Sequence, residues 1–587
     1  MNNNIFLAIV ISVAIWLGFN HYFIKPQQEA MENQRISKEQ KSSGGVPDAV
    51  SAAIIQELKA RDEIIASDSR IRFSTNAILG SLNLKGARFD DVILKNYFKN
   101  PDDPNSNIVL LSPVGSDDPH RASYADFNWL ASDKSLRLPD ASAVWTADRQ
   151  EIKPDVPVKL VWNSPDSLLF ERIISVDEEQ MFTITDLVTN KSEKSVTLYP
   201  YGAVARHGIP FDSHDSAVVQ EGPIGVFKGT LEELSYNKMI DSKEDRLSHE
   251  TKGGWVGITD KYWLMSLVPP QSENITASFA YSGAGAKRPE LGFFQADYRH
   301  NNPIVISPGT TSEVTSRLFV GAKKIELLDK YADEFSIPNF DKAIDFGWFY
   351  FLTRPFLYLL TILDKTTGSM ALAILVFTVL LKIVTLPLSQ KSYRSMAKMR
   401  ELQPEIKSIQ ERFGEDKMRL SQEIMQLYKR EQVNPMSGCF PMIIQIPIFF
   451  ALYKVLYVNI EMWQAPFYGW ISNMAEPDPT SVFTLFGLIP IQLPYFLQVG
   501  AWPVIMGLTM FLQQKLSPQP QDKTQANVFI IMPFLFTFML AHMPAGLVIY
   551  WTWSNILGIA QQWYIIKSEE KKRGIKKADV QIEHSKK

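Results

Sequence analysis

From about residue 345 onward, the chain alternates between long apolar runs and connections that carry either many Lys and Arg residues or none. The connections 389–438, 515–527 and 567–587 are basic, whereas 461–481 has acidic residues without Lys or Arg and 544–546 has no charge. Basic connections between membrane-spanning segments stay in the cytoplasm. This half of the chain therefore predicts a multi-pass helical bundle whose hairpin loop and C-terminus are cytoplasmic.

Five apolar runs in this half are about long enough to cross a bilayer. The predicted spans are 370–388, 439–458, 498–514, 528–543 and 547–566, separated by the hairpin loop 389–438, an outer loop at 459–497 and a cytoplasmic loop at 515–527, and followed by the basic cytoplasmic tail 567–587. The region 326–369 also contains an apolar stretch, but Arg354 and Pro355 interrupt it. We expect an amphipathic region at the membrane interface there. If it crossed the membrane instead, the preceding domain would be cytoplasmic.

The N-terminus begins with another apolar run, residues 1–24. A cleaved signal peptide has a basic start and small residues at its cleavage site, and neither is present here. We therefore favour an uncleaved anchor with a cytoplasmic N-terminus over a cleaved signal. Residues 25–60 are polar with few apolar side chains, which predicts a flexible linker. An anchor of this kind exports the domain on its C-terminal side, so residues 61–325 are expected outside the cytoplasm.

Residues 61–325 have the alternating apolar and polar pattern of β-strands, with Gly, Pro, Asn and Asp between the segments. The segments 181–190 and 195–202 predict a hairpin with a turn at Asn190–Glu193. Further strands are predicted at 158–164, 169–176, 275–282 and 315–323, which together favour a β-sandwich. The fold class is thus a multi-domain membrane protein, with an α-helical transmembrane core, its N-terminal anchor and a large all-β exported domain.

The composition and the motifs exclude several classes of protein. Lys and Arg number 60 against 63 Asp and Glu, which excludes a strongly basic nucleic-acid binder. Cys439 is the single cysteine, so a disulfide scaffold is excluded. The chain has no nucleophile-elbow, zinc-protease or P-loop motif. We expect no catalytic residue, no metal site and no cofactor.

Lys382 is the most informative single residue, because it lies within an apolar run. A Lys inside the membrane costs several kcal/mol unless it is hydrated or paired, and such residues usually have a function. The alternative is that its side chain reaches the cytoplasmic surface. Thr378 lies one helical turn away on the same face. No acidic residue occurs in the other spans, while Gln445 and other polar residues do. This pattern favours a hydrated groove with one cation over a buried ion pair.

The basic loop 389–438 contains apolar residues at helical spacing, including Met396, Met399 and Phe413, with Gly414 as a break. A second amphipathic helix follows the break. The pattern predicts a coiled-coil hairpin with a charged outer face, to which Arg400 and Lys417 contribute. It is either a plain connector or a docking arm, and its length favours the arm.

The chain resembles the YidC/Oxa1/Alb3 membrane insertase family, in its long Gram-negative form. The resemblance rests on SMAKMRELQPEIKSIQERFGEDK, NPMSGCFPMIIQIPIFFALYKVL, QAPF, TMFLQQKLSP and MPAGLVIYWTWSNILGIAQQ, within roughly residues 345–570. It implies five helices around a hydrophilic groove that is open to the cytoplasm and to lipid, and an exported β-supersandwich similar to sugar mutarotases. The implied groove residues are Lys382, Thr378, Gln445 and Tyr550. Lys382 occupies the place where the family typically has Arg, and Lys lacks the planar donor fork of Arg.

The expected function is that of an insertase and chaperone for proteins of the bacterial inner membrane, acting alone or with the Sec translocon. The apolar part of a substrate is expected to leave along the spans 439–458 and 528–543, on a slide formed by Phe440, Ile446, Phe449 and Phe534. Expected partners are nascent membrane proteins, the Sec translocon with its accessory subunits, the ribosome and the phospholipid bilayer, with no specific nucleic acid. The alternative is a transporter or channel, which would need acidic ion sites and inverted repeats. A cell-envelope enzyme is a third class, but the β domain has no cluster of carboxylates or histidines to support it.

Overall fold

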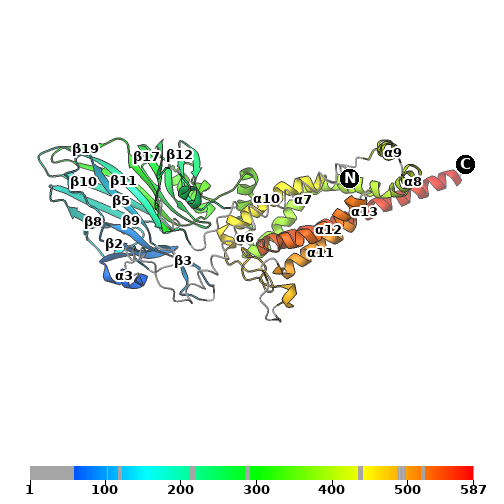
Figure 1. Cartoon of the computed structure of the whole chain (residues 1–587), viewed down its shortest axis with the longest axis horizontal. Coiled ribbons are helices and arrows are strands. Elements are labelled where there is room, and N and C mark those ends of the chain that lie inside the picture. Colours follow the sequence, from blue (N-terminus) through cyan, green and yellow to red (C-terminus); the bar gives the residue numbers. More distant parts are fainter. Residues whose placement is uncertain are drawn as a thin grey trace. The chain divides into compact units, whose positions relative to one another are not determined.

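The computed structural model describes residues 59–585 except 102, 117–121, 211–218, 243, 284–290, 415, 434–439, 487, 490–493, 495–496 and 517–522. The predicted anchor 1–24 and nearly all of the linker 25–60 lie outside these residues. The chain divides into two compact units between Asp345 and Phe346. Strands make up most of the first unit and helices make up the second (Figure 1).

The first unit contains two large β-sheets. In the described residues, one has eleven strands in the order β14-β17-β18-β11-β5-β3-β2-β1-β7, with β19 on β11 and β4 on β3. Its strands are β1 Arg70–Ser74, β2 Ile78–Asn83, β3 Arg88–Phe98, β4 Asn107–Leu111, β5 Ser123–Ala131, β7 Glu151–Ile152, β11 Val196–His207, β14 Arg246–Lys252, β17 Asn274–Ser282, β18 Phe293–His300 and β19 Ile304–Ile306. Nearly all of its pairings are antiparallel, and β1 with β7 is parallel.

The second sheet has nine strands in the described residues, in the order β13-β12-β15-β16-β20-β10-β9-β8-β6. They are β6 Thr146–Ala147, β8 Val158–Asn163, β9 Leu168–Val176, β10 Met181–Asn190, β12 Gly222–Phe227, β13 Thr230–Glu233, β15 Trp255–Thr259, β16 Trp263–Val268 and β20 Thr311–Ala322. Strand β9 is buried at every second residue, as expected for a strand with one face on a core. All six strand segments predicted from sequence are strands here.

The predicted hairpin between 181–190 and 195–202 is wrong. Strand β10 pairs with β9 and β20 in one sheet, whereas β11 pairs with β5, β18 and β19 in the other. The short connection therefore carries the chain from one sheet to the other. Alternation identifies a strand with one buried face, but it does not identify the neighbour with which that strand pairs.

The core of the first unit lies between the two sheets. Phe89 on β3 and Phe182 on β10 are in edge-to-face contact at 5.1 Å between ring centroids, so side chains from both sheets interdigitate. Arg172 is buried in this layer and forms an ion pair with Asp186, with Nε and Oδ1 2.6 Å apart. The unit is a β-sandwich with paired charges inside.

The sandwich also contains short helices, and two of them fall in the region 326–369 that the sequence predicted as an amphipathic interfacial region. The short helices are α3 Arg61–Ser67, α4 Tyr236–Ile240, α5 Ile325–Glu334 and the 3-10 helix η4 Phe340–Ala343. The Tyr331 hydroxyl on α5 donates to Asp177, and Phe340 packs edge-on against Trp255. Residues 325–345 are therefore part of the β unit, which extends about twenty residues beyond the predicted boundary at 325.

The second unit is helical throughout its main elements. Its α-helices are α6 Tyr350–Thr367, α7 Met370–Glu401, α8 Gln403–Phe413, α9 Lys417–Arg430, α10 Phe440–Val458, α11 Ala501–Leu516, α12 Lys523–Leu540 and α13 Ala545–Ser585, and short 3-10 helices lie at η6 Ile460–Met462 and η7 Val482–Thr484. Each of the five predicted spans corresponds to one helix. Two helices continue far beyond their predicted spans: α7 forms the start of the hairpin, and α13 runs through the predicted tail.

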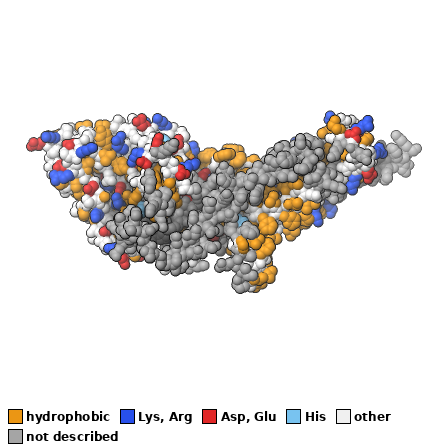
Figure 2. Space-filling view, in the orientation of Figure 1, with side chains coloured by type: hydrophobic (Ala, Val, Ile, Leu, Met, Phe, Trp, Pro, Cys, Tyr) orange, Lys and Arg blue, Asp and Glu red, His pale blue; other side chains and the backbone are white. Residues whose placement is uncertain are grey.

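The surface of the helical unit is rich in apolar side chains (Figure 2). Among the described residues, one helix is both long and apolar enough to cross a membrane, Met370–Met399, and shorter apolar helices lie at Ile444–Val458 and Asn527–Leu540. Prolines at 355, 387, 447 and 533 lie inside α6, α7, α10 and α12. Neighbouring helices make such prolines tolerable in membrane bundles.

Candidate functional site

Five helices of the second unit enclose a cavity of about 260 Å³, which we name the Lys382 cavity. Its lining comes from α7 (Lys382, Thr385, Leu388, Ser389, Tyr393, Met396), α10 (Ile444, Gln445, Ile448), α11 (Met510, Gln513, Gln514), α12 (Phe529, Met532, Pro533) and α13 (Trp551, Ser554, Asn555, Gln562). The lining combines amides and hydroxyls with apolar side chains. Such a surface can hold water next to an apolar segment.

Lys382 is the only charged residue among those that line the cavity. It forms no ion pair with any described residue, and none of the described residues that line the cavity carries a carboxylate. A cation among uncharged polar groups retains a long-range attraction for anions, because no carboxylate of the described lining neutralises it. Nor do the described residues contain a cluster of three or more His, Cys, Asp or Glu that could hold a metal ion.

Gln445 lines the cavity together with Lys382, and its Nε2 donates to the Tyr550 hydroxyl at 3.0 Å. Tyr550 is itself buried and lies behind the lining. Thr378 is also buried, but its hydroxyl donates to the Ile374 carbonyl of its own helix at 2.7 Å. Of the four predicted groove residues, two thus line the cavity, one supports the lining, and Thr378 does neither.

The predicted slide residues lie on α10 and α12. Ile446 and Phe534 are at least half exposed and face away from the helical packing, as lipid-facing side chains do. Phe449 instead packs against Trp551, with ring centroids 4.5 Å apart. Phe440 begins α10, but its side chain lies outside the described residues.

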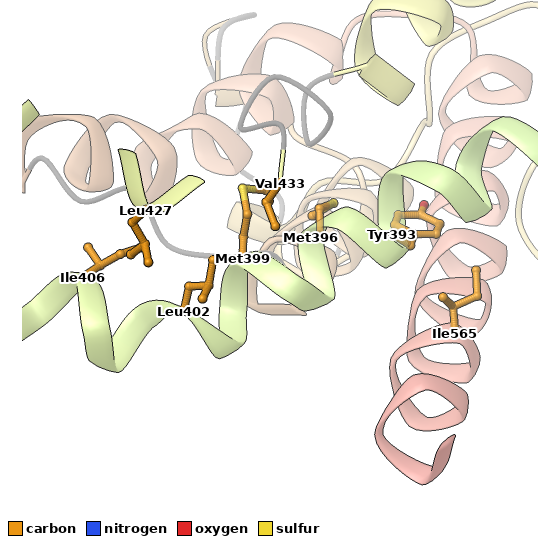
Figure 3. Close-up of a cluster of buried hydrophobic side chains, with 8 residues drawn as sticks. All are labelled: Tyr393, Met396, Met399, Leu402, Ile406, Leu427, Val433 and Ile565. Atoms are coloured by element: carbon orange, nitrogen blue, oxygen red, sulfur yellow. The ribbon is translucent and has the colours of Figure 1, made fainter. Parts of the chain in front are cut away.

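The hairpin consists of the end of α7 together with α8 and α9, and a buried apolar cluster joins it to α13. Figure 3 shows the eight side chains of this hairpin cluster, which are Tyr393, Met396, Met399, Leu402, Ile406, Leu427, Val433 and Ile565. Ile565 comes from α13, so the hairpin packs against the last helix of the bundle. The predicted residues Met396 and Met399 are members of the cluster, and Phe413 is half-buried at the end of α8. The side chains of Arg400 and Lys417 are outside the described residues.

Tyr393 and Met396 belong both to the hairpin cluster and to the lining of the Lys382 cavity. The buried Tyr393 hydroxyl shares a hydrogen bond with Gln513, another residue of the lining. Tyr393 was not predicted as a cavity residue. The signal was available in the spacing, because Lys382, Thr385, Ser389, Tyr393 and Met396 follow one face of a helix at intervals of three and four.

Helix α6 packs against the bundle through one face. Its Phe356 contacts Phe377 of α7 edge-on, with centroids 5.1 Å apart, and its Thr361 hydroxyl donates to Glu461 at 2.9 Å. Phe351 and Ile362 on the same helix remain exposed. Helix α6 therefore braces α7, the helix that carries Lys382, and still presents apolar side chains outward.

Two protein families match the chain in adjacent regions. Residues 70–359 match the family described as the YidC periplasmic domain, and residues 362–572 match the family described as 60Kd inner membrane protein. The division falls near the start of the helical unit.

Full-length relatives match as well. The chain is 43% identical to the protein named membrane protein insertase YidC from Rickettsia bellii, over 97% of this chain and 100% of that one. It is also 43% identical to the protein of the same name from Beijerinckia indica, over 96% of each chain. A crystal structure of an active YidC insertase with its first transmembrane domain resolved is similar at a TM-score of 0.35 and 16% identity, over 85% of this chain and 93% of that one.

Proposed function

Because the chain belongs to the YidC family of membrane protein insertases, we propose that the Lys382 cavity is the hydrophilic groove through which it moves polar segments of its substrates. The observation that carries the proposal is that, among the described residues lining a cavity between five helices, Lys382 is the one cation and its neighbours are uncharged. Water in this cavity shortens the apolar path that a polar segment must cross. The positive charge attracts acidic segments of the substrate.

No bond is made or broken in this mechanism. The driving force is the transfer of the substrate's apolar helix from water into lipid, which is favourable in proportion to the apolar area buried. The exposed faces of α10 and α12, including Ile446 and Phe534, form the slide along which that helix leaves. The apolar part of α12 extends only over Asn527–Leu540, which fits a bilayer that is locally thin.

The protein is an inner-membrane protein with a periplasmic domain. We further place both termini, the hairpin and the loop between α11 and α12 in the cytoplasm, with the β unit in the periplasm. Positive charge supports this topology, since it is concentrated in the connections assigned to the cytoplasm. Helix α6 then lies at the outer interface, where the Arg354 guanidinium lies over the rings of Tyr350 and Tyr358.

The hairpin is proposed as the docking arm for the ribosome and nascent chains. Its surface carries many charges, including the ion pair between Arg430 and Glu405, whose Nη2 and Oε2 atoms are 2.9 Å apart. Its buried cluster reaches the cavity through Tyr393 and Met396, so a chain delivered to the hairpin arrives beside the groove. The Sec translocon and its accessory subunits are proposed as partners for larger substrates.

Transport of ions or solutes is the second candidate, and the cavity lining argues against it. A secondary transporter usually couples to an ion through acidic side chains, and no Asp or Glu is found among the described residues that line this cavity. For an enzymatic site in the β unit, the described residues offer no group of three or more His, Cys, Asp or Glu that could hold a metal ion.

Site-specific photo-crosslinking tests the groove directly. A crosslinker at Met510, which lines the cavity, is expected to capture a stalled nascent membrane protein. The matched control is Leu508, on the same helix but more than half exposed and away from the lining. Stronger capture of the polar tail from position 508 than from position 510 contradicts the proposal.

A further inference from the structure

Gly558 lies in the middle of α13, where glycine is an unfavourable choice. Glycine costs about 1 kcal/mol relative to alanine inside a helix, because it loses more conformational freedom on folding. A buried glycine at such a position needs a packing reason. The surroundings of Gly558 supply one that involves the Lys382 cavity.

A Cβ atom at position 558 would lie 2.9 Å from Gln513 Nε2, 3.6 Å from Gln513 Cδ and 3.7 Å from Lys382 Nζ. The ends of two cavity side chains, from α11 and α7, therefore occupy the space that a side chain on α13 would take. Gly507 provides a contrast within the same unit. A Cβ there would lie 2.0 Å from Thr537 Oγ1, which is close packing between α11 and α12 away from the cation.

We propose that Gly558 is a positioning residue of the groove: by lacking a side chain, it lets the Lys382 ammonium group and the Gln513 amide lie together over the backbone of α13. This inference rests on the proposed function of the cavity. It adds that Gly558 determines where the positive charge of the cavity lies. Lys382 has four methylene groups and many rotamers, so its own helix does not fix the position of the ammonium group.

The distances predict a graded response to added bulk. A methyl group in Gly558→Ala is too close to the Gln513 amide, which must move, but it is in ordinary contact with Lys382. A branched side chain in Gly558→Val also reaches the ammonium group and displaces it. Gln513 is hydrogen-bonded to Tyr393, so its movement also alters the contact between the cavity and the hairpin cluster.

The test compares two substrates that differ only in an acidic or a neutral exported tail, in cells depleted of their own insertase. Gly558→Val is expected to lose the preference for the acidic tail and to change the labelling of Lys382 by an amine-reactive reagent in the purified full-length protein. Ala560→Val is the matched control, because Ala560 is exposed two residues further along α13. It should keep both properties.

A double variant separates displacement from general damage. With Gln513→Ala, the methyl group of Gly558→Ala has room, so the double variant should behave like Gln513→Ala alone. If Gly558→Val fails to accumulate in membranes, Lys382 labelling is compared between Gly558→Ala and the double variant Gly558→Ala with Gln513→Ala. That comparison then decides the result. Unchanged labelling and unchanged tail preference in the Gly558 variants overturn the inference, as does an equal loss in Ala560→Val.

Lys382→Met distinguishes failure of this inference from failure of the proposed function. Loss of the tail preference in Lys382→Met, with none in Gly558→Val, leaves the groove intact and overturns only the role of Gly558. A preference that survives in Lys382→Met overturns both.

Discussion

Gln445 on α10 and Tyr550 on α13 are joined by a hydrogen bond of 3.0 Å from the amide Nε2 to the phenol oxygen. The bond links the helix that bears the proposed slide to the last helix of the bundle. It also fixes the amide of Gln445 at the wall of the Lys382 cavity, with its nitrogen directed toward Tyr550.

Tyr550→Phe removes the acceptor of this bond and keeps the ring. We expect a loss of stability of about 1 kcal/mol, since the Gln445 amide loses a buried partner. Thermal unfolding in detergent measures the loss. Gln445→Leu in the Tyr550→Phe background should add little further loss, because the shared bond is already gone. Additive losses contradict the coupling.

The charge at position 382 should govern insertion of substrates with acidic exported tails. Lys382→Glu or Lys382→Ala should impair them, and Lys382→Arg should be tolerated. A hydrated ion pair contributes up to about 1 kcal/mol, so the neutral variant should lose up to about fivefold in insertion efficiency. Protease protection of the tail measures it. Lys515→Met is the control, because Lys515 stacks on Phe511 outside the lining. Full activity of Lys382→Glu would falsify the groove mechanism.

Shortening the hairpin tests whether it is a docking arm or a plain connector. Replacement of residues 396–428 by a brief loop should abolish growth rescue while the protein remains inserted in the membrane. A subtler variant, Ile406→Ala, removes a side chain that is 1% exposed and should destabilise the hairpin by about 2–5 kcal/mol. Limited proteolysis of the hairpin reports the change. Complete rescue by the shortened protein supports a plain connector.

The β unit should be dispensable for simple substrates, and α6 should not. Because α5 and η4 pack within the sandwich, the cut is placed after Asp345. Deletion of 60–345 should leave insertion largely intact. Deletion of α6 should be severe, because Phe356 and Thr361 brace α7 and Glu461. Growth rescue by each deletion measures the contrast. If the 60–345 deletion is inactive, the β unit takes part in insertion itself.

The isolated β unit, residues 59–345, should fold alone and become more stable between pH 8 and about pH 10.5. Lys323 is buried, and burial lowers its pKa to about 8, while Asp345, Asp260, Glu221 and Glu233 raise it. In this window the folded unit releases a proton that the unfolded chain keeps, so stability rises with pH by up to about 1.4 kcal/mol per unit. Below pH 8 both states hold the proton and the contribution of Lys323 is flat.

Urea unfolding at several pH values measures this slope. Its control is Lys324→Met, a neighbour without the same burial, which should keep the slope. Lys323→Met should flatten it. If the slope persists in Lys323→Met, groups other than Lys323 cause the rise of stability with pH.

The sequence predicted element types better than partners. Strand β10 was predicted at its observed bounds, because its alternation is local, but its pairing with β20 joins residues more than a hundred positions apart. Lys382 and Gln445 were predicted to share a site, and both line the cavity. Thr378 was placed with them by its position on the helix, yet its hydroxyl bonds to the Ile374 carbonyl instead. Gly558 was not predicted, because its proposed role depends on the absence of a side chain. Hydrophobic periodicity does not detect such a role.

The continuity of α13 has a mechanical consequence. A helix of 41 residues is about 60 Å long, roughly twice the thickness of the hydrocarbon core. The same rod carries Tyr550 and Gly558 beside the cavity and extends well past Ile565, where the hairpin rests on it. A tilt of a few degrees at the cavity therefore displaces Ser585 further than it displaces the residues beside the cavity. A fluorophore at Ser585 can thus report what occupies the cavity.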